Sequence, residues 1–192
     1  MILAADEVVR SLGGTWELLQ RRRQGLRQFN YSDAGLLRSF AAIALCAPAF
    51  VTLLAAERAR AGLLLPEASL FEDASPVWTV IVKLAAIWLA TPLVACAFTR
   101  MLGIGSRLGG FLIVGNWSSV LACAFAAVPS LFFALGLATP ELADLYAFAA
   151  MVLIAHLRWF TIRESLGVSS GLAALIAVVI LVVESSVGAF VA

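Results

Sequence analysis

The stretch that decides the fold is Gly109–Leu135, GGFLIVGNWSSVLACAFAAVPSLFFAL, which runs for 27 residues without one charged side chain. A helix needs about 20 predominantly apolar residues to cross a bilayer. The apolar residues here form a continuous run rather than an alternation, which argues against a strand of a membrane barrel. The stretch therefore predicts a membrane-spanning helix.

The rest of the chain has the same character. Of its 192 residues, 62% are hydrophobic and 13% are charged, and the mean hydropathy is +1.01. A soluble domain is expected to have about 45–50% apolar and about 25% charged residues, so a soluble fold is excluded. We predict an all-α membrane protein: an N-terminal segment, residues 1–30, precedes a bundle of five transmembrane helices, residues 31–192. The predicted spans are about 35–56, 76–98, 109–135, 142–160 and 169–191.

The basic residues divide unevenly between the two ends of these spans. With the N-terminus in the cytoplasm, ten Arg fall on the inner side and two on the outer side. Because short cytoplasmic loops carry an excess of Lys and Arg, this predicts an inner N-terminus and, after five spans, an outer C-terminus. The inner residues are Arg10, Arg21, Arg22, Arg23, Arg27, Arg38, Arg100, Arg107, Arg158 and Arg163; the outer ones are Arg58 and Arg60.

The N-terminal segment carries an apolar stripe at helical spacing, which predicts an amphipathic helix. This helix either lies on the inner face of the membrane or packs beneath the spans, and Gly13-Gly14 would weaken it or divide it in two. The Arg cluster after it could bind anionic lipid, although the positive-inside distribution alone also accounts for it. The candidate headgroup contacts are Trp16, Arg21, Arg22, Arg23 and Arg27. Ser32 or Asp33 can cap the first span.

Two charged residues lie well inside the predicted spans, where charge is rare and costly. Lys83 in the second span and Glu184 in the fifth lie at about the same depth in the outer half. We expect them to form an ion pair that joins the two helices. The pair could serve as a structural clamp or as a coupling or proton-relay site, and the lack of a chain of further titratable groups favours the clamp.

A second polar group is predicted nearer the inner side. Asn116 in the third span, His156 near the inner end of the fourth and Arg100 at the end of the second lie at similar levels and could meet. Three prolines interrupt the predicted spans, where proline removes an amide and kinks a helix. These prolines, Pro48, Pro92 and Pro129, mark either ordinary bends or the wall of a polar cavity.

The sequence carries no pattern typical of catalysis or of a metal site. Ser118 and Ser119 with His156 invite comparison with intramembrane serine proteases, but the Gly-x-Ser-Gly arrangement of such enzymes is missing. The acidic and His residues lack metal-ligand spacing. Cys46, Cys96 and Cys123 lack paired spacing and are interpreted as small packing residues. We expect no catalytic residue, no metal, no cofactor and no nucleic-acid partner.

The order of these segments resembles the Yip-domain family, in which a cytoplasmic segment precedes five closely spaced spans. Phe29-Asn30-Tyr31-Ser32 and Gly35-Leu36-Leu37-Arg38-Ser39-Phe40 are similar to the entry of span one in small bacterial proteins of this type. Eukaryotic members interact with Rab GTPases and organise secretory membranes. Their Asp-Leu-x-Gly-Pro signature is absent here, so no functional residue is carried over.

The sequence favours a non-enzymatic protein that acts through protein or lipid contacts, as an accessory subunit of a membrane complex or as a membrane-organising factor. A small transporter or permease subunit using Lys83 and Glu184 is the alternative. The expected partners are the lipid bilayer, including anionic lipid, and a membrane protein or a second copy of the chain. The Arg-rich, Lys-poor composition suggests a bacterial inner membrane.

Overall fold

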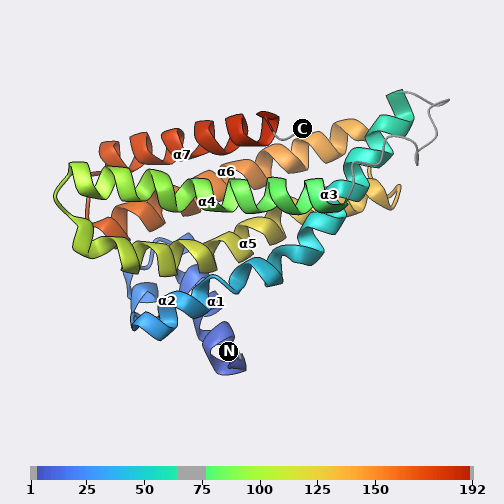
Figure 1. Ribbon diagram of the computed structural model, residues 1–192. Helices are drawn as coiled ribbons and strands as arrows, with labels where there is room; N and C mark the ends of the chain where they lie inside the picture. The colour runs from blue at the N-terminus through green and yellow to red at the C-terminus, as the bar shows by residue number, and fades with distance from the viewer. Residues whose placement is uncertain (1–3, 65–76, 191–192) are drawn as a thin grey trace.

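The computed structural model describes residues 4–64 and 77–190, and this part of the chain is all-helical. The long helices lie side by side in one elongated bundle, and the N-terminal helices lie along its flank next to α5 (Figure 1). The N-terminal elements are α1, Ala5–Leu19, the 3-10 helix η1, Arg23–Gln28, and α2, Asp33–Ser39. The bundle helices are α3, Ala42–Leu64, α4, Val77–Met101, α5, Leu108–Ala134, α6, Pro140–Leu166, and α7, Ser170–Phe190; the 3-10 turn η2, Gly105–Arg107, precedes α5.

Four helical stretches are long and apolar enough to cross a membrane, which confirms the membrane-embedded character of the chain. They are Asp33–Leu53, Gly105–Ala134, Pro140–Leu166 and Ser170–Val187. In α4 the described apolar stretch is shorter, Ala85–Met101. The fifth span therefore stays a prediction, although the backbone of α4 is helical over 25 residues.

The fourth predicted span, 142–160, is six residues too short at its C-terminal end, because α6 continues to Leu166. Thr139 caps its start with an oxygen that accepts from Leu142 N, and Pro140 occupies the first turn. The helix ends only at Gly167, whose φ of 62° favours glycine. Arg107 Nη1 donates to the Leu166 carbonyl there. Arg158, which the sequence assigned to the inner loops, consequently lies two turns inside a helix.

Helix α5 is the centre of the bundle and packs most extensively against α3 and α6. Helices α3 and α5 run in the same direction, because three successive contacts join residues 77 positions apart: Ser39 with Asn116, Cys46 with Cys123, and Ala56 with Phe133. Ser39, Ala42, Cys46 and Ala56 are buried at spacings that fit a heptad repeat, which is the pattern of helices packed knobs-into-holes.

Helix α1 packs on α5 and α6 rather than standing apart from the bundle. The face it buries is small and polar: Glu7, Ser11, Gly14, Thr15 and Leu18. The predicted apolar stripe is only partly covered, and Val9 and Trp16 remain 70% and 50% exposed. The structure shows α1 packed against the flank of the bundle; a place beneath the spans and contact with the membrane surface both stay predictions.

Gly13-Gly14 does not divide α1, which is continuous from Ala5 to Leu19. A Cβ at Gly14 would lie 2.7 Å from the Gly25 carbonyl oxygen. The glycines therefore permit η1 to fold back against α1, and the loss of helix propensity is offset by this close packing. Ser32, one of the two predicted caps, accepts from Gly35 N at 3.1 Å and starts α2.

The three prolines predicted inside spans lie inside helices. Pro48, Pro92 and Pro129 belong to α3, α4 and α5. The kinks expected at these positions stay predictions. Pro92 directly follows Thr91, whose hydroxyl donates to Glu184 on α7.

The parallel pairing of α3 with α5 predicts a crosslink. The Cys46 and Cys123 side chains contact each other across the two helices, although both thiols are free. Treatment with a membrane-permeant oxidant should therefore join them within one chain, leaving Cys96 open to alkylation. Peptide mass spectrometry identifies the bridge, and Cys123→Ala should abolish it. A bridge that instead includes Cys96 would contradict the observed register.

Candidate binding site

Three bundle helices meet at one charged pair. Arg158 on α6 donates two hydrogen bonds to Glu184 on α7, from Nη1 to Oε2 at 2.6 Å and from Nη2 to Oε1 at 3.1 Å. Thr91 on α4 donates to the same Oε1 at 2.7 Å. Bidentate guanidinium–carboxylate pairs are strong and geometrically specific, so this contact fixes α4, α6 and α7 relative to one another.

The pair lies deep in the bundle. Arg158 is eight residues from the end of α6, Thr91 ten residues from the end of α4, and Glu184 fourteen residues from the start of α7. At a rise of 1.5 Å per residue, all three are about 12–21 Å from the same end. These positions therefore lie well inside the helices and not at their ends. The side chains are only 28% and 15% exposed.

Two hollow spaces adjoin the charged pair. The first, called the inner cavity, measures about 130 Å³ and lies between α4 and α5. These two helices make few contacts with each other. The second, called the apolar hollow, measures about 420 Å³ and lies among α3, α5, α6 and α7. Arg158 and Glu184 line both spaces, so the pair stands at the boundary between them.

The inner cavity has a polar wall and the apolar hollow does not. Trp88, Thr91, Asn116, Ser119 and Cys123 line the inner cavity together with the charged pair. Much of the apolar hollow is lined by alanines, whose small side chains leave the space open; they are Ala126, Ala147, Ala150, Ala155 and Ala177. One side of the site therefore offers hydrogen bonds and the other offers apolar contact.

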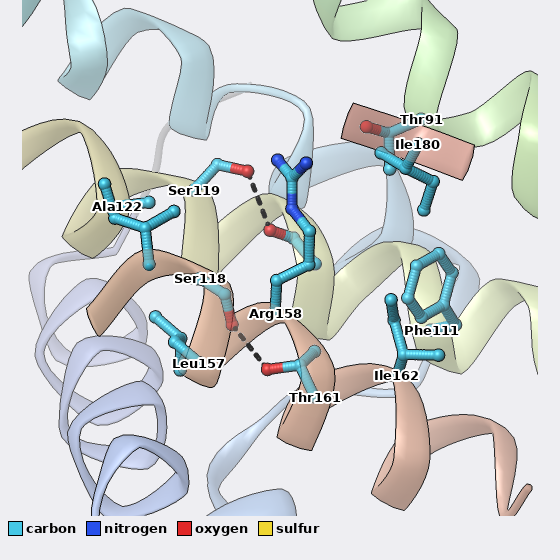
Figure 2. A pocket seen from close by; sticks show the side chains of 12 residues that line it. Thr91, Phe111, Ser118, Ser119, Ala122, Leu157, Arg158, Thr161, Ile162 and Ile180 are labelled. Carbon is cyan, nitrogen blue, oxygen red and sulfur yellow. Dashed lines mark hydrogen bonds between the residues drawn. The ribbon is translucent and has the colours of Figure 1, made fainter. Parts of the chain in front are cut away.

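The inner cavity contains donors that lack protein acceptors. A guanidinium has five N–H groups, and in the described part of the chain Arg158 uses two of them, both on Glu184. The indole Nε1 of Trp88 is buried and has no acceptor among the described residues. Figure 2 shows the Arg158 guanidinium extending beyond Ser119 toward Thr91. Since buried donors are normally satisfied, an oxygen-bearing molecule suits this place.

A third cavity, about 50 Å³, adjoins the inner cavity at Arg158 (Figure 2). Its polar groups already have partners: Ser119 Oγ donates to the Gly115 carbonyl at 3.0 Å, and the hydroxyls of Ser118 and Thr161 are 3.5 Å apart. These hydroxyls contact a neighbouring residue rather than a histidine. The arrangement therefore gives no support for activating Ser118 or Ser119 as a nucleophile.

The structure assigns Glu184 a partner that the sequence did not indicate. Glu184 lies level with Thr91, and Lys83 is eight residues earlier in α4, or about 12 Å along the helix. The Lys83 side chain lies outside the described residues, so its pairing with Glu184 stays a prediction. In the described contacts, Glu184 joins three helices through Arg158 and Thr91. The predicted Lys83–Glu184 pair would join only two.

The second predicted cluster is dispersed. Asn116 Nδ2 donates to Ser39 Oγ at 2.9 Å, which ties α5 to α2. His156 stacks on Trp159, with ring centres 5.9 Å apart. Arg100 is exposed at the end of α4. Similar depth did not bring these side chains together, because they lie on helix faces with different neighbours.

Two of the predicted headgroup residues contact the C-terminal part of α6. Trp16, Arg21, Arg22, Arg23 and Arg27 are all exposed. Arg21 lies over the Trp159 ring, and Arg23 pairs with Glu164 at 3.3 Å. The described residues contain no group of three His, Cys or acidic side chains placed to hold a metal ion.

The sequence analysis did not identify the positions that two charged residues occupy inside the structure. Arg158 was counted as an inner-side Arg, although the predicted span 142–160 includes it and the apolar run 147–155 precedes it. Glu7 is 6% exposed and pairs with Arg38 on α2 at 2.8 Å. Its place on the buried side of α1 has no signal in the sequence, since the apolar stripe pointed to the opposite face.

Comparison with protein-family models, with curated proteins and with solved structures gave no match. Any function assigned to this chain therefore depends on the geometry of the site.

Breaking the charged pair should destabilise the protein. Arg158→Gln or Glu184→Gln leaves one buried charge without its partner, at a cost of about 3 kcal/mol. The melting temperature in a mild detergent should fall by about 6–12 °C. The double variant Arg158→Met/Glu184→Leu removes both charges and should recover much of that loss.

Lys83→Met is the matched control for this experiment. If Arg158 neutralises Glu184, Lys83→Met should change the melting temperature much less than Arg158→Gln does. An equal or larger fall for Lys83→Met would show that Lys83 is the partner of Glu184.

Proposed function

We propose that the chain is a non-enzymatic membrane protein that binds a small amphipathic molecule within the bilayer, as a small transporter or permease subunit does. The observation that carries this proposal is the position of Arg158 and Glu184 between a polar cavity and an apolar hollow. An intramembrane charged residue that lines a cavity commonly marks a substrate pathway.

The chemistry of the two spaces defines the ligand. The indole N–H of Trp88 is buried without an acceptor. It could donate to a carboxylate or carbonyl oxygen, and so could the N–H groups that Arg158 does not use on Glu184. The alanine-lined hollow of about 420 Å³ suits an aliphatic chain or a ring. A molecule with an oxygen head and an apolar body would place its head beside Arg158 and its body in the hollow.

A second function is favoured by the bidentate geometry of the same pair. Glu184 already neutralises Arg158 and accepts a hydrogen bond from Thr91, as expected of a pair whose role is to hold the helices together. A bundle held in this way would act through its surface, as an accessory subunit or membrane-organising factor. Large apolar side chains are exposed along α6, including Tyr146, Phe148 and Met151, and they would face lipid or a partner chain.

The topology, the membrane and the family resemblance inferred from the sequence belong to the same proposal. A five-span topology with an inner N-terminus would place the charged pair within the membrane and the Arg-rich segment in the cytoplasm. A bacterial inner membrane and a Yip-like ancestry fit this order of helices and rest on sequence pattern alone. Dependence on a partner chain or a second copy is expected only for the clamp function.

Palmitic acid is a suitable probe, because it joins a carboxylate to an aliphatic chain. Native mass spectrometry of the detergent-released protein should show a palmitate adduct. Ala177→Leu fills the apolar hollow and should weaken the adduct about tenfold, since blocking the site costs at least about 1.4 kcal/mol of binding free energy. Ala174→Leu, on the exposed side of α7, is the control and should bind as the parent chain does.

The charge variants separate the two functions. Arg158→Met/Glu184→Leu should lose the palmitate adduct while remaining folded. The swapped pair Arg158→Glu/Glu184→Arg should restore stability if the pair is a clamp, but should not restore binding. Equal adducts in the parent chain, Ala177→Leu and the double variant would contradict the proposed ligand site and leave the clamp function.

A further inference from the structure

The inner end of α6 carries a second group of charged residues that the intramembrane site does not use. The guanidinium carbons of Arg21 and Arg163 each lie 5.7 Å from the centre of the Trp159 ring. The two cations are therefore at most about 11 Å apart. Like charges repel each other most strongly within the Debye length at physiological salt, about 8 Å, and an anion between them would stabilise both.

The carboxylate of Glu164 does not neutralise the positive charge of the neighbouring arginines. Glu164 is shared by Arg23, at 3.3 Å, and Arg163, at 3.6 Å. Among the described residues Arg21 forms no salt bridge, and Arg22 and Arg27 lie in the same exposed segment. The segment 16–28 holds four Arg and one acid, Glu17. The group formed by Arg21, Arg23, Arg163 and Glu164 therefore keeps a net positive charge.

The backbone at Arg21 is held in a conformation that suits glycine. Arg21 is the only described non-glycine residue with a positive φ, 60°. It follows the end of α1, where Arg21 N donates to Leu18 O at 2.9 Å and Arg22 N donates to Glu17 O at 2.8 Å. This is the Schellman pattern, in which glycine is preferred at the position that Arg21 occupies. Arg21 adopts this conformation with its guanidinium over the Trp159 ring.

The position of the group matches the headgroup region of a membrane. Arg163 is three residues from the end of α6, and Trp159 is seven, or about 10 Å at 1.5 Å per residue. The indole N–H of Trp159 donates to the Ser170 carbonyl at the start of α7. Trp at this depth and Arg nearer the end are the residues typical of a bilayer surface, and a guanidinium binds phosphate oxygens in a bidentate manner.

We propose that Arg21 and Arg163, whose guanidinium groups both lie against the Trp159 ring, bind the phosphate of one anionic phospholipid at the inner end of the bundle. The lipid phosphate would lie between the two guanidinium groups and relieve their repulsion, while Trp159 contacts the glycerol region and the acyl chains extend along α6. Binding here is separate from the ligand proposed for Arg158, because the two groups share no residue and Arg163 lies five residues after Arg158 along α6.

The test measures the melting temperature of the full chain in a neutral detergent with added lipid. Phosphatidylglycerol should raise the melting temperature by several degrees, whereas phosphatidylcholine with the same acyl chains and inorganic phosphate should not. Arg21→Gly should melt at the same or a higher temperature without lipid, because glycine relieves the backbone strain. It should nevertheless lose at least half of the phosphatidylglycerol effect, and so should Arg163→Gln.

Arg100→Gln is the matched control, since it removes one exposed Arg at the inner end of α4. It should keep the full phosphatidylglycerol effect. A full effect in both Arg21→Gly and Arg163→Gln would overturn the proposal, and so would an equal loss in Arg100→Gln, which would show diffuse attraction to basic charge. Equal stabilisation by inorganic phosphate would overturn the assignment to lipid.

Discussion

Arg158 and Glu184 bring opposite charges together at a depth where neither has bulk water to solvate it, and much of the bundle is arranged around that requirement. Removing ions from water costs several kcal/mol each, so the two side chains must remain in contact. Thr91 supplies a further hydrogen bond to the carboxylate. Because the three residues come from α4, α6 and α7, satisfying the pair sets the relative height of three helices.

The remainder of the bundle depends on a different kind of contact. Helix α5 packs closely on α3 and α6, and buried Trp117 lies in the cluster that also receives Leu18 of α1. Asn116 adds a hydrogen bond to Ser39. Helix α4, by contrast, packs mainly on α7 and little on α5. The inner cavity lies between these two tightly packed parts, and the charged pair crosses from one part to the other.

Much of the fold could be predicted from the sequence, because only helices and closed barrels can span a lipid bilayer and a long apolar run forms a helix. Four of the five predicted spans are confirmed as helices long enough to cross a membrane, and the predicted cap at Ser32 is present. Span four was ended at residue 160 because Arg163 and Glu164 were treated as loop residues, whereas α6 continues to Leu166. An Arg residue can belong to a membrane-spanning helix because its long side chain carries the charge well away from the backbone. Gly13-Gly14 was predicted to weaken α1, but Gly14 is explained by the carbonyl of Gly25 that approaches it.

The sequence by itself determined that the chain is helical and membrane-embedded, that its Arg residues are divided unevenly between the two ends of the predicted spans, and that Glu184 is an intramembrane acid in need of a partner. These properties depend on composition and on position along the chain. Only the tertiary structure decided that Arg158 and Thr91 are the partners, that Asn116, His156 and Arg100 have separate neighbours, and that Arg21 lies over Trp159. Each of these contacts joins different helices, and helix rotation and relative height are set by packing in three dimensions, which the spacing of residues along one helix does not encode.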